Sequence, residues 1–240
     1  MQSITIKKIN YEKVNYSICD SNGNAVRKIV FSISRNRDRK ERGCKKTAKT
    51  YFDLMINVVS THLNYGSANS ELADYKKTTN GIQAGASFLA GITPAFSLVS
   101  EFYYIRRGGK LKANNPLSGN ETTLRLNTLE LPVLARLHIG SLYVNAGPSI
   151  AYNLSGKNKI GELSNKLSFS NSSEGFKRFD ASVQIGGGVE FPFKQKRIAV
   201  DIRYNYGLTN IAYGREIYNR GVMVSVFFSK AWKTNPLGKK

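Results

Sequence analysis

The sequence contains no stretch of about 18 consecutive apolar residues, which is the minimum that a transmembrane helix needs. The first 50 residues also lack the apolar stretch of a signal peptide. For an exported protein, this gap is explained by a mis-assigned start, a frameshift or a fused N-terminal segment, and the sequence does not choose among the three. Any passage through a membrane must use the other structure that lipid tolerates, a closed β-sheet.

Cysteine and histidine are scarce. The two cysteines, Cys19 and Cys44, both lie in the N-terminal segment, and the two histidines are His62 and His138. None of these residues stands in a CxxC or His-rich spacing that binds a metal ion. We therefore expect no metal site and no cofactor, and we expect His138 to have a structural role.

Negative charge is also scarce, since 16 acidic residues face 36 basic ones and the net charge is +20. Basic chains often bind nucleic acid or anionic surfaces. Here the excess lies in the N-terminal segment, the loops and the C-terminus, and residues 27–49 alone hold ten basic side chains. We interpret this run as a solvated tail, with a contact to RNA or lipid headgroups as the alternative. The expected organisation is a basic segment over residues 1–50 that is disordered or reflects a mis-assigned start, a barrel over 51–230 and a basic tail over 231–240.

From about Met55 onward, apolar and polar residues alternate in runs that are separated by turn residues. This pattern indicates β-strands. The expected strands cover residues 55–64, 81–92, 97–107, 124–139, 142–155, 179–191, 197–208 and 221–228.

The connections between these strands alternate in length. Residues 93–95, 140–141 and 192–196 form short turns, whereas 66–80, 108–123, 156–178 and 209–220 form long polar loops. Short turns on one rim and long loops on the other are typical of outer-membrane barrels. We therefore predict an all-β fold, a closed antiparallel up-and-down transmembrane β-barrel of about eight strands.

Alternation alone fits two opposite proteins, because a soluble barrel has its apolar face inside and a membrane barrel has it outside. The polar face favours the membrane barrel. Lysine, which is common on water-exposed surfaces, is nearly absent from the middle of the strands, and Gly, Ser, Asn and Gln replace it. A narrow packed interior accommodates these small residues.

Charges of both signs occur on the polar face, and we expect them to pair inside the barrel because unpaired buried charges are costly. Glu130 should find basic groups on flanking strands, and Arg203 should pair with Asp180 or Glu190. The predicted interior charge network consists of Glu101, Glu130, Arg136, Asp180, Glu190, Asp201 and Arg203.

No motif in the sequence indicates catalysis. The Gly108-Gly109-Lys110 segment lacks the spacing of a phosphate-binding loop, and the three glycines at 186–188 lie inside a strand. The segment that starts at Gly147 lacks the closing glycine of a nucleophile elbow. Glu101 and Glu130 form a glycosidase-like pair only if they are close together, and we favour ion pairing for both. We therefore expect no catalytic residues and no enzyme activity.

Four segments resemble the PorT-like outer-membrane β-barrel proteins, often called porin-family proteins, and the likeness extends from Asn57 to Phe228. The segments are residues 97–108 (SLVSEFYYIRRG), 129–134 (LELPVL), 142–148 (LYVNAGP) and 201–211 (DIRYNYGLTNI). The resemblance implies a barrel of the Gram-negative outer membrane, with a link to protein secretion. One departure is that the chain continues past Phe228, whereas such barrels usually end at an aromatic residue.

The sequence thus predicts a non-enzymatic outer-membrane barrel that is structural or an accessory to envelope transport or secretion. Its expected partners are outer-membrane lipid and envelope or secretion-machinery proteins, with no nucleic acid and no identified small-molecule substrate. Two alternatives remain, a soluble basic barrel that contacts nucleic acid and an outer-membrane hydrolase. Eight strands enclose an interior that side chains fill, so we expect no general porin activity.

Overall fold

A computed structural model divides the chain into two compact units, Met1–Thr47 and Ala48–Lys240. The structure describes residues 13–19, 25–31, 49–67, 69–193 and 196–231. In the first unit, β1 (Lys13–Cys19) and β2 (Ala25–Phe31) pair as an antiparallel hairpin. Cys44 and Trp232 lie outside the described residues.

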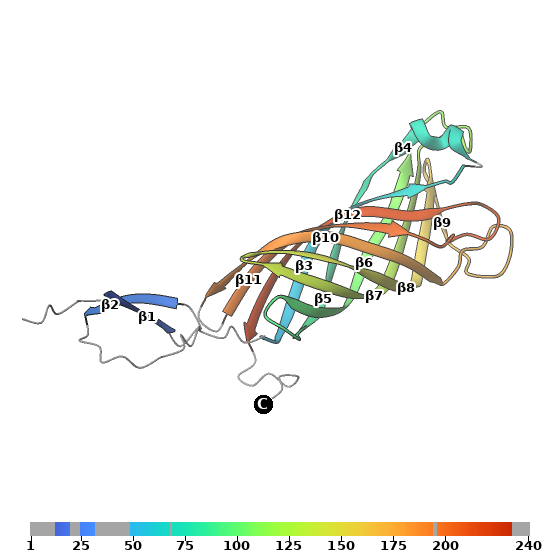
Figure 1. Ribbon diagram of the computed structural model, residues 1–240. Helices are drawn as coiled ribbons and strands as arrows, with labels where there is room; N and C mark the ends of the chain where they lie inside the picture. Colours follow the sequence, from blue (N-terminus) through green and yellow to red (C-terminus); the bar gives the residue numbers. More distant parts are fainter. Residues whose placement is uncertain (1–12, 20–24, 32–48, 68, 194–195, 232–240) are drawn as a thin grey trace, which may run out of the picture. The chain divides into compact units, whose positions relative to one another are not determined.

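The second unit is a closed, all-antiparallel barrel of eight strands (Figure 1). Each barrel strand pairs with the next one along the chain, and the last strand pairs with the first, so the sheet has no free edge. The strands are β3 (Tyr51–Asn64), β5 (Thr79–Gly91), β6 (Phe96–Leu111), β7 (Thr122–Ile139), β8 (Leu142–Ile160), β10 (Phe179–Phe193), β11 (Lys196–Gly207) and β12 (Tyr218–Ala231). The eight expected strands and the predicted fold class are confirmed.

Short turns and long loops lie at opposite ends of the barrel. A two-residue turn at Gly140 and Ser141 joins β7 to β8, and Gly140 has the positive φ of 67° that such a tight turn favours. The long loops carry extra elements, the 3-10 helix η1 (Ser70–Tyr75) and the short strands β4 (Lys76–Lys77) and β9 (Leu163–Lys166). Among the described residues, no helix is long and apolar enough to cross a bilayer.

The apolar faces of the strands point outward. In β3, Leu54 and Ile56 are 67% and 72% exposed, whereas the alternating residue Asn57 is 1% exposed. The same orientation recurs in β11, where Ile202 faces out and Arg203 faces in. A soluble barrel requires the opposite orientation, because a continuous exposed apolar band is unfavourable in water. Lipid stabilises this band, so the orientation is that of a transmembrane barrel.

The apolar side chains of β7 lie on the outward face in one part of the strand and on the inward face in the other. The pairing register between β7 and β6 stays the same throughout. Toward the short-turn end, Leu131 and Val133 face outward and Glu130 faces inward. Toward the loop end, Leu126 is buried inside and Arg125 is exposed outside. The membrane-type arrangement therefore ends near Asn127, and the rest of β7 is patterned like a strand of a soluble protein.

Candidate functional site

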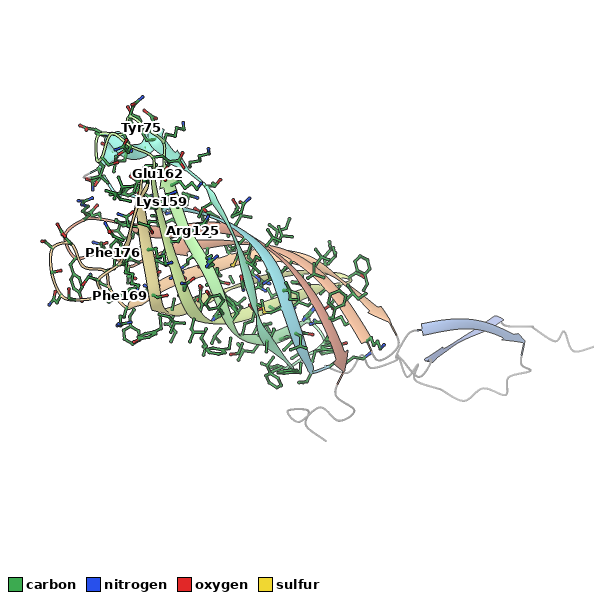
Figure 2. The ribbon with its side chains drawn as sticks, turned by 180° about the vertical axis from the view of Figure 1, so that it is seen from behind. Tyr75, Arg125, Lys159, Glu162, Phe169 and Phe176 are labelled. Atoms are coloured by element: carbon green, nitrogen blue, oxygen red, sulfur yellow. The ribbon has the colours of Figure 1, made fainter. Side chains whose placement is uncertain are left out.

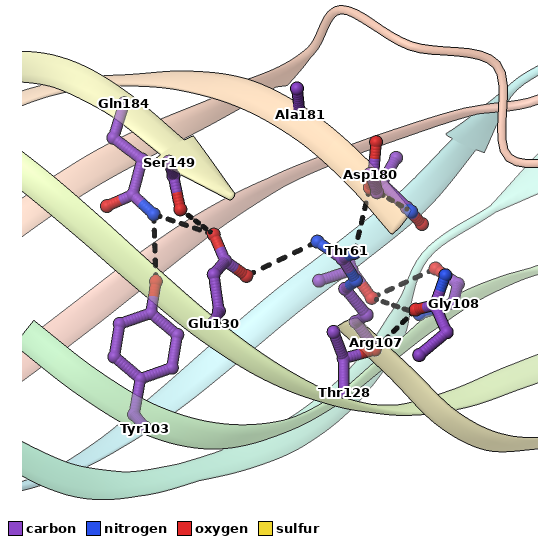
Figure 3. Close-up of polar contacts among 12 residues, drawn as sticks. Thr61, Tyr103, Arg107, Gly108, Thr128, Glu130, Ser149, Asp180, Ala181 and Gln184 are labelled. Carbon is purple, nitrogen blue, oxygen red and sulfur yellow. Dashed lines mark hydrogen bonds and ion pairs between the residues drawn. The ribbon is translucent and has the colours of Figure 1, made fainter. Parts of the chain in front are cut away.

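The polar interior of the barrel is the candidate functional site, and Arg107 of β6 organises its first group. Its guanidinium donates to Asp180 at 2.8 Å and to Glu130 at 3.3 Å. Glu130 also accepts hydrogen bonds from Ser149 at 2.8 Å and from Gln184 at 2.9 Å (Figure 3). Four strands contribute to this group, so it ties the wall of the barrel together across its interior.

A second group surrounds Arg203 of β11. Two guanidinium nitrogens donate to the two carboxylate oxygens of Glu101, each at 2.7 Å, and Nε donates to Asp201 at 3.0 Å. The planar fork of arginine suits this bidentate geometry. Arg136 lies 3.8 Å from Asp201 and stacks on the Tyr143 ring at 3.9 Å. All four charged side chains are nearly inaccessible to solvent.

A third group lies at the short-turn rim. Arg197 donates to Asp53 at 2.6 Å and to Glu190 at 3.2 Å. Glu190 also contacts His138 Nδ1 at 3.2 Å, and the other ring nitrogen, Nε2, lies 2.9 Å from the Ser97 hydroxyl. Ser97, His138 and Glu190 therefore form a continuous hydrogen-bonded chain. No motif in the sequence indicated this arrangement.

The structure places all seven residues of the expected charge network on the inward face, six of them buried and Glu190 partly buried. It divides them among three groups. Glu130 and Asp180 share Arg107, whereas Glu190 joins Arg197 at the rim. The group around Arg203 contains the remaining four, which are Glu101, Arg136, Asp201 and Arg203 itself.

The expected partners of Arg203 are wrong, because it pairs with Glu101 and Asp201 and not with Asp180 or Glu190. In the register of β10 and β11, Arg203 is opposite Gly186. Glu190 is four residues from Gly186 and Asp180 six, or about 13 and 20 Å at 3.3 Å per residue. Both carboxylates are too far along the strand.

The glycines on the inward face of β10 make the cross-barrel pairing possible. A Cβ atom at Gly186 would lie 2.7 Å from Cγ of Arg203, and one at Gly188 would lie 2.5 Å from Cβ of Asp201. The bare backbone therefore leaves space for both side chains to extend over β10. This close approach of side chains to the backbone explains the run of glycines at 186–188 inside the strand.

Three charged residues of these groups were missing from the expected network, namely Asp53, Arg107 and Arg197. Each lies at or beyond the end of an expected strand. The strand alternation predicts their inward orientation, because Asp53 is two residues before Met55, Arg107 six after Glu101 and Arg197 four before Asp201. Only Asp53 lies outside the expected strands, since Arg107 and Arg197 are terminal residues of the expected strands 97–107 and 197–208.

Apolar side chains gather at one end of the barrel interior. At the loop end, an apolar cluster fills the barrel mouth with residues from the strands and loops, namely Leu63, Tyr65, Leu72, Leu111, Leu124, Leu126, Ile211, Ala212 and Ile217. Below this cluster, a cavity of about 10 Å³ lies against Arg107 and Glu130. That volume holds about one water molecule. Within the described residues, the three charged groups and this cluster lie across the interior of the barrel.

An antiparallel barrel with lipid-compatible side chains outside and paired charges inside defines an integral membrane β-barrel protein. Residues 51–213 match the family described as outer membrane protein beta-barrel domain. The chain belongs to this family, and membership implies a place in the bacterial outer membrane. No curated protein matches the chain.

The chain is also similar to several solved structures at low sequence identity. Ail, the attachment invasion locus protein of Yersinia pestis, is 13% identical with a TM-score of 0.42, over 75% of this chain and 99% of that one. The outer membrane protein OprG of Pseudomonas aeruginosa is 10% identical with a TM-score of 0.43, over 79% and 99%. Neisserial surface protein A is 10% identical with a TM-score of 0.44, over 73% and 95%.

Proposed function

We propose that the protein is a non-enzymatic and non-conducting barrel of the outer membrane. In this proposal it is structural or an accessory to envelope transport or secretion, and it works with envelope or secretion-machinery proteins. One observation carries the proposal, namely that buried ion pairs and an apolar cluster fill the interior. The resemblance of residues 97–108 and 201–211 to PorT-like proteins supports the link to secretion.

Planar-bilayer recording tests the absence of conduction. The purified, refolded protein is expected to give no stable channel, because opening a water path would separate Arg203 from Glu101 and expose the apolar mouth. Reproducible porin-sized current steps contradict the proposal. Boiled and unboiled samples, which migrate differently on a denaturing gel when a barrel has folded, verify that the tested protein is native.

Deletion of the gene in its native host tests the accessory role. The expected result is a change in the set of secreted or surface proteins that a plasmid copy restores. Crosslinking of the intact protein in the envelope then identifies the partners. An unchanged set of secreted proteins, together with a weakened envelope, favours the purely structural role.

A serine hydrolase is the second candidate, because Ser97, His138 and Glu190 are connected as nucleophile, base and orienting carboxylate. Two observations favour a structural role for this chain of hydrogen bonds. Ser97 is only 3% exposed, and Arg197 already engages Glu190. A fluorophosphonate probe decides between the two, since a hydrolase forms a covalent adduct that Ser97→Ala abolishes. We expect no labelling of either protein.

A further inference from the structure

Cations from three neighbouring strands lie side by side on the outward face near the loop end. Arg125 of β7 is directly opposite Lys157 of β8, and Lys157 is directly opposite Lys166 of β9. Lys159 lies on the same face, two residues beyond Lys157. All four side chains are exposed (Figure 2 labels Arg125 and Lys159). We refer to Arg125, Lys157, Lys159 and Lys166 as the basic row.

The basic row is unfavourable in the isolated protein. Neighbouring strands lie about 4.8 Å apart, and like charges directly opposite each other destabilise a sheet. Among the described residues, none of the four cations has a carboxylate within ion-pair distance. The nearby Glu121 pairs with Lys110 instead, at 3.7 Å, and Glu162 is exposed at the β8–β9 turn. The row therefore presents positive charge that an external anion could neutralise.

The position of the row relative to the membrane narrows the choice of anion. The outward apolar face of β7 ends at Leu129, and that of β8 ends at Leu154. Arg125 is four residues beyond Leu129, which is about 13 Å along the strand and about 10 Å along the membrane normal at a tilt of roughly 40°. The headgroup layer is about 5–8 Å thick on each side of the hydrocarbon, so the backbone of Arg125 lies just beyond this layer and its long side chain reaches back to it. Tyr152, on the same outward face of β8, is of the type that anchors barrels at this interface.

We propose that the basic row binds the phosphate groups of lipid headgroups in the leaflet on the loop side. Arginine offers a fork of donors to phosphate oxygens and lysine offers a mobile point charge. A lipid is favoured over a soluble polyanion because its acyl chains would continue onto the exposed apolar side chains of Leu154 and Ile150. The inference rests on the proposed residence in the outer membrane and adds a specific lipid site to it.

Native mass spectrometry of the full-length protein in detergent measures this binding. Phosphatidic acid, with its phosphomonoester headgroup, is the probe, and phosphatidylcholine is the zwitterionic reference. The wild-type protein is expected to bind phosphatidic acid about tenfold more tightly than the reference. The variant R125Q/K157Q/K166Q is expected to lose affinity on the order of a hundredfold, because each basic residue near an anionic surface contributes a factor of about five.

A matched control removes three exposed cations from other loop positions, in the variant K77Q/K112Q/R215Q. This variant is expected to bind phosphatidic acid like the wild type, and K157R/K166R is expected to retain binding because it preserves the charge. Equal losses in the two triple variants would overturn the proposed site. Displacement of the lipid by an equal concentration of inorganic phosphate would overturn the assignment to a lipid headgroup.

Folding is checked for every variant by its heat-dependent migration on a gel. If the triple variant does not refold, the single variant K157Q replaces it, with an expected loss of about fivefold. The same loss in K157Q and K77Q contradicts the proposal. Failure of the proposed function would instead appear in the wild type itself, as a protein that conducts or leaves the membrane fraction.

Discussion

The two ends of β7 have their apolar side chains on opposite faces, although they belong to one continuous strand. In the half toward the short turns, which we call the membrane half, Val133 faces lipid and Glu130 lies inside. In the half toward the long loops, which we call the loop half, Leu126 lies inside and Arg125 faces out. The backbone and the pairing with β6 are continuous through the change. The pairing with β8 shifts register between Asn127 and Thr128, and the surroundings of the outer face change from lipid to water or headgroups. The comparison shows that the solvent outside decides which face of a strand is apolar.

The interior of the barrel also differs between its two halves, being polar within the membrane and apolar at the loop end. Within the membrane, the outer face already buries its apolar surface in lipid, so the interior can be polar if its charges are paired. Beyond the membrane, the loops must form a core of their own, which Tyr65, Leu126 and Ile217 provide. Burial raises the pKa of Tyr65 to about 12, because removal from water in this core disfavours the charged form of its hydroxyl.

The largest loss of stability is expected from R203M, in the membrane half of the barrel. The substitution leaves Glu101 and Asp201 buried without their closest cation, and removing one partner of a buried pair costs about 3–5 kcal/mol. Guanidinium titration of the refolded barrel in detergent measures the loss. The control, K110M, breaks a solvent-exposed pair with Glu121 and should cost less than about 1 kcal/mol. Equal and small losses would show that the polar face is solvated.

In the loop half, L126A is expected to be nearly as damaging. Leu126 is fully buried in the apolar cluster, and truncation of such a side chain costs about 2–5 kcal/mol. T123A changes the outward face of the same part of β7 and should stay within about 0.5 kcal/mol. The same titration applies to both. A small effect of L126A would mean that the loop end contributes little to stability.

The boundary between the halves can be located with arginine substitutions on the outward face. V133R places a charge toward lipid and should cost about 2–4 kcal/mol in phospholipid vesicles. L129R, four residues along the same face and opposite the uncharged Tyr104 and Tyr152, should cost at most about 1 kcal/mol because it lies near the interface. Similar costs at both positions would move the boundary away from Asn127.

The smallest change in barrel stability is expected from removing the N-terminal unit. A protein that starts at Lys49 retains all eight barrel strands and the apolar cluster. Its free energy of unfolding should match that of the full chain within about 0.5 kcal/mol. Refolding in detergent followed by titration measures this. If only the full chain refolds, the first unit is needed for barrel assembly.

The sequence predicted most of the fold and part of the candidate site. Alternation gave the inward orientation of Glu101, Glu130 and Arg203, because side chains in a strand point to opposite faces in turn. It did not give their partners. Arg203 and Glu101 are 102 residues apart and lie on strands that do not pair with each other. No local pattern reports a contact made across the lumen.

The sequence by itself determined the eight strands, their alternating faces and the segregation of short turns from long loops, since these follow from local periodicity and turn chemistry. Only the tertiary structure decided which charges pair, how the mouth is closed and where cations gather in a row. Those features depend on barrel closure and on the register between strands. Arg125, Lys157 and Lys166 are scattered in the chain, and the pairing of β7, β8 and β9 brings them together.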